Sequence, residues 1–469
     1  MVFSSIPFLF LFFPMFLLVY FLAPRKFKNF ILMVFSLVFY AWGEPIYIVL
    51  MIFSSLWDFV ISKKIEKHKR VIKKKKLYLV LSIVINLLSL GFFKYADFLI
   101  TNINNIFNIS IPLLKLGLPI GISFYTFQTM SYTIDVYREE IPAERNFINY
   151  LTYVSMFPQL IAGPIVRYET IHKELKERTT NIFEISEGFL RFLRGIFKKV
   201  LIANNIGYLF SLISVLPNNE MSVLTSWLGI FAFGFQIYFD FSGYSDMAIG
   251  MGRMLGFHYL ENFDYPYISK SITEFWRRWH ISLSTFFKDY LYIPLGGSRV
   301  KKIVNIRNIL IVWILTGLWH GAAWNFIIWG IYYGIILVLE KFILNKYIEK
   351  LPNFFKHLYT LFLVFIGWMI FAFDDVNRLS SFTKIMFGFE DVKFIDTTFL
   401  YYIKNYFIII LLASIFSTPI YLKAKELFSK FKFKKLLFIT TVAIYLYLFI
   451  ISISYLISDT YNPFLYFRF

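Results

Sequence analysis

The sequence contains no cysteine among its 469 residues. This absence excludes disulfides, cysteine-ligated zinc sites, iron–sulfur clusters and any mechanism with an acyl-cysteine intermediate. Charged residues are scarce too, at 16% against about 25% in typical soluble domains. Hydrophobic residues make up 58%, and Phe alone accounts for 59 positions. This composition excludes disordered, collagen-like and coiled-coil chains and predicts an all-α polytopic membrane protein.

Further absences narrow the classes of function. The sequence has no P-loop and no H-E-x-x-H motif, which argues against an ATP-driven pump and a zincin protease, and we expect no metal site. None of the six histidines has an Asp five positions later, so the H-x-x-x-x-D acyltransferase pattern is missing. The net charge of +19 comes from short basic segments between apolar runs. These segments lack interleaved stacking aromatics, so we expect membrane lipid and no nucleic acid as a partner.

The same basic segments predict the orientation of the chain in the membrane. No Lys or Arg precedes Arg25, and no small-residue cleavage site follows the apolar run at 6–23, so this run is interpreted as a retained transmembrane helix. Residues 63–76 carry nine Lys or Arg and one Glu, which predicts a cytoplasmic loop and an extracytoplasmic N-terminus. The C-terminus is expected outside as well.

Other apolar runs complete the predicted topology of about ten to twelve transmembrane helices. No internal repeat, linker or shift in composition marks a second domain, so residues 1–469 are expected to form one integral-membrane domain. The further spans are expected at about 29–42, 46–62, 77–93, 116–134, 147–166, 187–215, 224–250, 358–373, 400–421 and 436–457.

One apolar stretch does not fit a single crossing. Residues 308–340 contain no Lys or Arg, and basic residues flank both ends. A helix of this length would reach about 50 Å, which is too long for one span of a hydrocarbon core about 30 Å thick and short for two. We therefore expect the chain to turn back inside the membrane at Gly317–Gly321, which places His320 at the turn.

His320 is the first candidate for chemistry. Trp313, Thr316, His320 and Trp324 share one stripe at helical spacing, and an ionisable residue inside a membrane is a functional candidate by default. A neutral imidazole can accept a hydroxyl proton near neutral pH. The alternative is a helix-packing surface with one buried, hydrogen-bonded histidine.

His280 is the second candidate. On one aromatic-rich helix, Trp276, Trp279 and His280 are expected to share a face. The neighbouring cations suit the phosphates of an anionic cofactor, or they anchor an interfacial helix by the positive-inside rule. These cations are Arg277, Arg278 and Lys288. Asp240 and Asp246 are lesser candidates that either line a polar path or cap helices.

The two histidine segments resemble the paired signatures of the membrane-bound O-acyltransferase (MBOAT) family. They read FWRRWHISLSTFFKDYLYIPLGGSR at 275–299 and LTGLWHGAAWNFIIWG at 315–330. Within this family the chain is most similar to the AlgI-like branch, which includes alginate and peptidoglycan O-acetyltransferases. Shorter similar stretches are FYAWGEP at 39–45, FPQLIAGPIVRY at 157–168, QIYFDFSGYSDMAIG at 236–250 and NPFLYFRF at 462–469.

The resemblance implies a fold, a reaction and partners. It implies a many-helix fold around a central funnel, and transfer of an acyl group from a cytoplasmic thioester to a hydroxyl. His320 matches the family's essential histidine, and His280 matches the second functional position. Acetyl-CoA is the expected donor, with no permanently bound cofactor. An extracytoplasmic esterase-like acetyltransferase partner is expected to pass the acetyl group to a polysaccharide acceptor.

A direct transfer suits a chain without cysteine. We expect His320 to act as general base, and His280 to polarise the thioester carbonyl or stabilise the intermediate. Arg277, Arg278 and Lys288 are expected to receive the phosphates of coenzyme A. Two alternatives remain: D-alanyl transfer from a carrier protein to teichoic acid, and a non-enzymatic polysaccharide exporter with a structural histidine pair.

Overall fold

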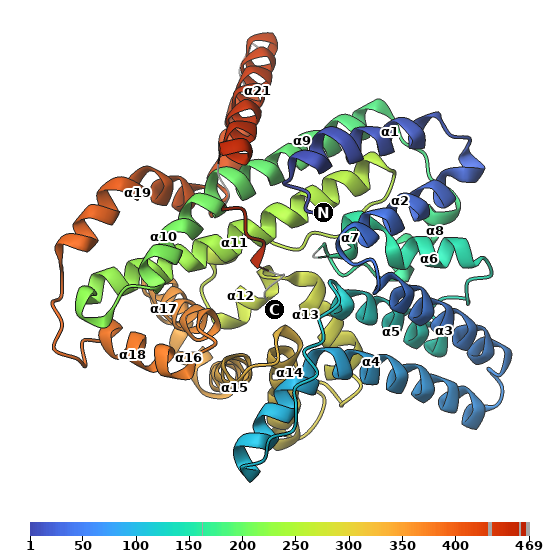
Figure 1. Ribbon diagram of the computed structural model, residues 1–469, viewed down its shortest axis with the longest axis horizontal. Coiled ribbons are helices and arrows are strands. Elements are labelled where there is room, and N and C mark those ends of the chain that lie inside the picture. Colours follow the sequence, from blue (N-terminus) through green and yellow to red (C-terminus); the bar gives the residue numbers. More distant parts are fainter. Residues whose placement is uncertain (162, 430–433, 459–460, 466–469) are drawn as a thin grey trace. The chain divides into compact units, whose positions relative to one another are not determined.

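The computed structural model describes residues 1–469 except 162, 430–433, 459–460 and 466–469 (Figure 1). The end of the stretch 462–469 and residue 162 of the stretch 157–168 therefore lie outside the described residues. The described residues form helices and contain no strand. The predicted all-α membrane fold class is confirmed.

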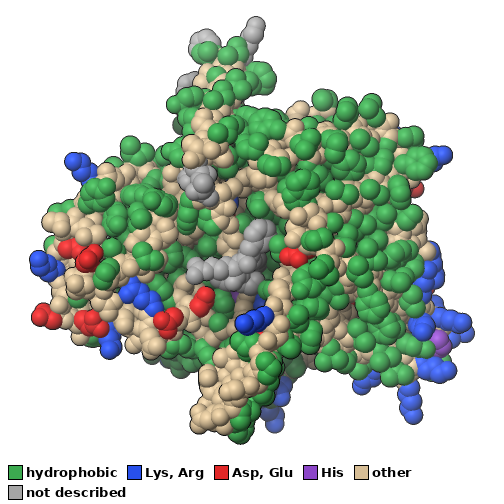
Figure 2. Space-filling view, in the orientation of Figure 1, with side chains coloured by type: hydrophobic (Ala, Val, Ile, Leu, Met, Phe, Trp, Pro, Cys, Tyr) green, Lys and Arg blue, Asp and Glu red, His purple; other side chains and the backbone are tan. Residues whose placement is uncertain are grey.

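Eight of the described helical segments are long and apolar enough to cross a membrane. Hydrophobic side chains also dominate the face shown in Figure 2, as a lipid-facing surface requires. The protein is therefore a multi-pass membrane protein, whereas the outward placement of its termini stays a prediction. The eight segments are Ile72–Phe107, Ile182–Ser214, Val223–Met254, Lys302–His320, Trp324–Ile348, Asn353–Ala372, Thr397–Phe416 and Leu436–Ser458.

The chain divides into two compact units. Unit 1 comprises residues 1–192 and 245–261, and unit 2 comprises residues 193–244 and 262–469. Both candidate histidines belong to unit 2. The prediction of one integral-membrane domain stays a prediction.

Unit 1 contains eight complete α-helices and the first part of α9. The predicted span at 147–166 is wrong, because two short helices replace it. Pro158 stands in the first turn of the second helix, where its ring is tolerated, and it prevents the first helix from continuing. The helices are α1 (Phe13–Leu22), α2 (Lys28–Gly43), α3 (Ile48–Lys67), α4 (Ile72–Phe107), α5 (Ile122–Arg138), α6 (Phe147–Ser155), α7 (Phe157–Leu160), α8 (Tyr168–Lys176) and α9 (Ile182–Phe197).

Unit 2 holds the remaining helices, and α11 (Val223–Met254) contributes residues to both units. Its hydrophobic core is rich in Trp, Phe and Tyr. The other helices are α10 (Asn205–Ser214), α12 (Ile272–Arg278), α13 (Ile281–Phe287), α14 (Lys302–His320), α15 (Trp324–Leu339), α16 (Asn345–Ile348), α17 (Asn353–Ala372), α18 (Val376–Met386), α19 (Thr397–Phe416), α20 (Ile420–Ser429) and α21 (Lys434–Ser458).

The stretch 308–340 is broken as the sequence predicts. Helix α14 ends at His320, Gly321 is extended, and α15 begins at Trp324 and lies side by side with α14 (Figure 1). A Cβ on Gly317 would lie 2.2 Å from the carbonyl oxygen of Phe326, so only glycine permits this close approach. Because Trp324 starts a new helix, the expected single stripe from Trp313 to Trp324 is wrong.

Candidate functional site

His320 is the last residue of α14 and is enclosed by aromatic rings. His320 is only 8% exposed. Three aromatic rings contact its imidazole edge to face. Their centroids lie 5.0 Å (Trp319), 5.0 Å (Trp329) and 5.3 Å (Phe371) from the centroid of the imidazole. These rings come from α14, α15 and α17, so the helix break positions the imidazole against its neighbours while keeping water away from it.

His280 occupies a kink between α12 and α13. Its φ of 45° and ψ of 55° lie in the left-handed region, which non-glycine residues adopt rarely unless their surroundings require it. Helix α12 already ends at Arg278, and Trp279 is extended. The expected continuous helix with Trp276, Trp279 and His280 on one face is therefore wrong.

Asn262 holds this kink in place through its backbone and side chain. Its carbonyl oxygen accepts a hydrogen bond from the backbone N–H of Ile281 at 3.0 Å. Its Oδ1 accepts from the backbone N–H of Ser282 at 3.2 Å and from the Ser282 hydroxyl at 2.9 Å. The same Oδ1 lies 3.2 Å from Nδ1 of His280. Asn262 is thus the residue that the sequence reasoning missed.

These contacts determine the tautomer of His280. A backbone N–H can only donate, so the Asn262 atom that it meets is an acceptor, and Nδ1 of His280 carries the proton that faces it. Burial lowers the pKa of His280 well below its usual value, and the nearby His320 lowers it further. His280 is therefore neutral, with a lone pair on Nε2.

Trp319 lies between the two histidines. Its ring centroid is 5.0 Å from that of His320 and 6.0 Å from that of His280, and His280 is 2% exposed. Phe241 of α11 covers His280 from another side at 4.6 Å. The structure thus brings together the two histidines that the sequence singled out, 40 positions apart, in one buried aromatic region of unit 2.

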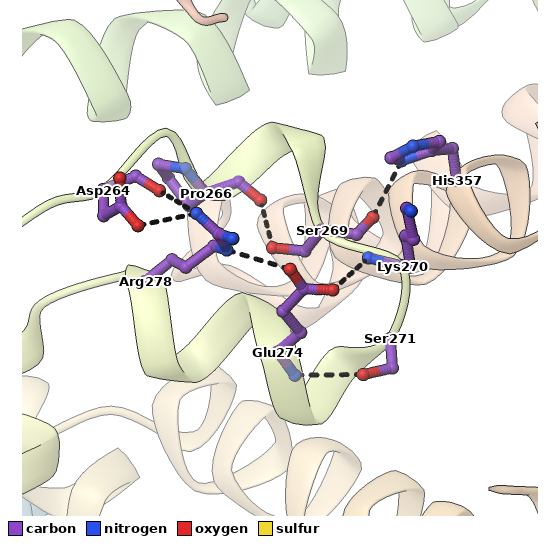
Figure 3. A network of polar contacts seen from close by, with 8 residues as sticks. All are labelled: Asp264, Pro266, Ser269, Lys270, Ser271, Glu274, Arg278 and His357. Carbon is purple, nitrogen blue, oxygen red and sulfur yellow. Dashed lines mark hydrogen bonds and ion pairs between the residues drawn. The ribbon is translucent and has the colours of Figure 1, made fainter. Parts of the chain in front are cut away.

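The three predicted phosphate-binding cations differ in their surroundings. Arg278 already pairs with Asp264 at 2.6 Å and with Glu274 at 3.0 Å (Figure 3). Lys288 is exposed and lies 3.6 Å from Asp289. Arg277 is exposed, and in the described part of the chain no ion pair or hydrogen bond joins it to the other two. Arg277 is the cation with the most freedom to meet a phosphate.

The two lesser candidates form ion pairs inside their own units. Asp240 pairs with Lys199 at 2.8 Å, and both side chains are 3% exposed. Asp246 pairs with Arg191 at 2.9 Å. Apolar context alone did not identify the partners, because each one lies on another helix, distant in sequence.

One acidic group has the spacing of metal ligands. Oxygens of Asp135, Glu140 and Glu169 in unit 1 lie within 4.8 Å of one another. Glu140 and Glu169 are exposed, and exposed carboxylates gather at protein surfaces without an ion. These three acidic residues are therefore not assigned a role in the reaction.

Comparison with known proteins connects this site with acyl transfer. The model of the membrane-bound O-acyltransferase family matches residues 130–383, which include Asn262, His280 and His320. A probable alginate O-acetylase from Pseudomonas syringae pv. tomato is 43% identical over 395 residues, covering 83% of this chain and 76% of that protein. A peptidoglycan O-acetyltransferase from Helicobacter pylori is 36% identical over 428 residues, covering 84% and 81%. A teichoic acid D-alanyltransferase from Bacillus subtilis is 31% identical over 258 residues, covering 50% and 62%.

Proposed function

Because this chain belongs to the membrane-bound O-acyltransferase family and is an O-acyltransferase, we propose that it transfers acetyl groups for O-acetylation of an exported cell-surface polysaccharide. The donor in this proposal is acetyl-CoA on the cytoplasmic side. The observation that carries it is the pair of buried histidines, His280 and His320, whose rings both contact the ring of Trp319.

In the proposed step, His320 is the general base. The acceptor hydroxyl loses its proton to the imidazole while its oxygen attacks the carbonyl carbon of the acetyl thioester. The carbon–sulfur bond then breaks, the proton passes to the departing thiolate, and the products are an acetyl ester and free coenzyme A. The rings of Trp319, Trp329 and Phe371 around His320 support this role, because a dry site protects the thioester from hydrolysis.

The hydrogen bonds of His280 favour a particular role for it. A neutral imidazole with its proton on Nδ1 accepts a hydrogen bond at Nε2 and cannot donate one to a carbonyl oxygen from that atom. We therefore propose that His280 accepts a hydrogen bond from the acceptor hydroxyl or from a polar group of the donor, and orients it toward His320. Polarisation of the carbonyl by His280 would need the other tautomer.

The donor-binding proposal rests mainly on Arg277. Arg278 already faces two carboxylates, which reduces its attraction for phosphate, whereas Arg277 projects from the same short helix into an exposed position. We propose that Arg277 contacts a phosphate of coenzyme A and that Lys288 adds a weaker, exposed charge.

The names of the relatives support a class of acceptor for this proposal. Those with matches over more than four fifths of this chain are named for alginate or peptidoglycan O-acetylation, and the match to the teichoic acid D-alanyltransferase covers half of it. We propose an alginate-like polysaccharide or peptidoglycan as acceptor, reached through an extracytoplasmic esterase-like acetyltransferase partner.

The choice of donor is tested in inside-out membrane vesicles that contain the protein. The vesicles receive acetyl-CoA labelled in the acetyl group or a carrier protein charged with labelled D-alanine, each with and without the extracytoplasmic partner. Transfer of the acetyl label supports the proposal. Transfer of only D-alanine moves the protein to teichoic acid modification, and no transfer of either label contradicts both donors.

A further inference from the structure

Two cations in unit 1 meet at one aromatic ring. The Nζ of Lys28, at the start of α2, lies 4.9 Å from the centroid of Tyr20, and the guanidinium carbon of Arg178 lies 5.9 Å from the same centroid. Like charges repel, so two cations at one buried ring are unfavourable unless an anion lies near both.

Arg178 is held rigidly by neutral oxygens. Its Nε donates to the Tyr20 hydroxyl at 3.0 Å, and one terminal nitrogen donates to Asn29 Oδ1 at 2.6 Å and to the carbonyl oxygen of Glu174 at 3.2 Å. The ring of Phe257 lies 4.5 Å from the guanidinium carbon. The guanidinium is therefore positioned before any ligand binds.

Neither cation has a carboxylate partner among the residues that the structure describes. The carboxylate of Glu174, the acid next to this group, accepts instead from the ring and backbone nitrogens of His258, at 2.8 and 3.1 Å. The second terminal nitrogen of Arg178 is buried and has no hydrogen-bond partner in the described chain. A partly buried guanidinium that contacts only neutral oxygens keeps an uncompensated charge, and an anionic oxygen would compensate it.

The surroundings indicate what carries this anion. Large apolar side chains beside the two cations are exposed, Leu18 by 62% and Leu22 by 77% on α1, and Phe27 by 47% before α2. Acyl chains cover such residues in a membrane, and basic side chains at the membrane interface bind lipid phosphates. Both features occur at the same end of α1.

We propose that Lys28 and Arg178 bind the phosphate of an anionic phospholipid, whose acyl chains lie along the exposed end of α1. The ligand class is a phosphodiester headgroup with net negative charge. The site is independent of the acyl-transfer proposal, because no residue of it belongs to the histidine region.

Native mass spectrometry of the purified full chain in detergent tests this proposal. The protein is titrated with dioleoyl phosphatidylglycerol or with dioleoyl phosphatidylcholine, and the retained lipid is counted. We expect phosphatidylglycerol to bind at least about tenfold more tightly, as one or two charge-assisted contacts would give. Equal retention of the two lipids would overturn the proposal.

Matched variants assign the preference to this site. Lys28→Gln removes a charge without breaking any hydrogen bond that the structure shows, and it should abolish the preference for phosphatidylglycerol. Arg178→Gln should do the same if it folds. Lys26→Gln is the control, because Lys26 is exposed and lies over Phe27 instead, 5.1 Å from its centroid. Equal effects of Lys26→Gln and Lys28→Gln would mean diffuse attraction to a basic segment and would contradict a site.

Competition distinguishes a lipid from a free phosphate ester. The protein is half-saturated with phosphatidylglycerol, and coenzyme A or inorganic phosphate is then added. Continued retention of the lipid supports the proposal, whereas displacement by coenzyme A would assign the site to the donor nucleotide and overturn the lipid. His320→Ala should bind phosphatidylglycerol as the unaltered protein does, so loss of catalysis and loss of this site are separable.

Discussion

Asn262 should be essential for the rate of acyl transfer although it is not expected to touch the reacting atoms. Replacement by Leu removes the Oδ1 that accepts from Nδ1–H of His280 and from two donor groups of Ser282, and leaves only the Ser282 hydroxyl, 3.4 Å away, near Nδ1. Loss of the acceptor for a buried neutral donor costs about 1–3 kcal/mol. If that energy is lost from the productive tautomer of His280, the rate falls about 5- to 150-fold, at 1.36 kcal/mol for each factor of ten.

The conservative variant provides the informative comparison. Asn262→Asp keeps an acceptor oxygen for Nδ1–H, so it should recover most of the rate at high pH. The new carboxylate raises the pKa of His280, and a raised pKa means that the imidazole becomes protonated, and loses its Nε2 lone pair, at a higher pH. The acid limb of the pH–rate profile should therefore move to higher pH in Asn262→Asp, with His320 as the other titratable group close to His280.

The assay is acetyl transfer in membrane vesicles between pH 5 and 9, with kcat and KM measured separately. We expect kcat to fall in Asn262→Leu while KM for the donor changes little, and size-exclusion profiles to show a folded protein. An unchanged kcat in Asn262→Leu would refute the tautomer argument. So would an Asn262→Asp variant as slow as Asn262→Leu at every pH.

Three further predictions concern packing, charge and the donor. Gly317→Ala should destabilise the α14–α15 hairpin and lower activity, because its Cβ would lie 2.2 Å from a backbone oxygen. Gly91→Ala, inside α4 with nothing within 4 Å, should not lower the thermal unfolding midpoint; equal midpoints for the two variants would contradict this packing. Lys199→Met leaves the buried Asp240 carboxylate without its cation and should cost about 3–5 kcal/mol of stability, which Lys199→Met with Asp240→Leu should largely restore in thermal unfolding; a single variant as stable as the parent would contradict a stabilising ion pair. Arg277→Glu should raise KM for acetyl-CoA about tenfold or more while Arg278→Gln changes it less, as loss of one charge-assisted contact implies; unchanged donor affinity in Arg277→Glu would remove Arg277 from the donor site.

The break at His320 was predictable because length and composition suffice for it. A stretch without basic residues that is too long for one span must bend, and the glycines at 317 and 321 mark the position. The structure ends α14 at His320 and places Gly321 in extended conformation. Here the local sequence contains all the information that determines the local structure.

The geometry at His280 was not predictable in the same way. Helical periodicity predicted a continuous helix, but α12 ends at Arg278 and His280 adopts a left-handed conformation before α13. The residue that holds this kink through hydrogen bonds is Asn262, 18 positions before His280. A single Asn in an irregular segment gives no periodic signal, because its partners are set by the path of the loop. The Lys199–Asp240 pair was not predictable for the same reason, because it joins two helices distant in sequence.

If His320 is the general base of acetyl transfer, its replacement should abolish turnover in membrane vesicles. Vesicles containing the unaltered protein, His320→Ala or the control His68→Ala receive labelled acetyl-CoA. His68 is a suitable control because its ring is half-buried and its Nδ1 bonds to the Lys64 carbonyl oxygen of its own helix. Release of free coenzyme A is counted together with labelled acetyl ester. We predict that His320→Ala loses at least about a hundredfold in rate, as removal of a general base implies, and that His68→Ala retains full activity. Equal turnover in His320→Ala and the unaltered protein would contradict the account.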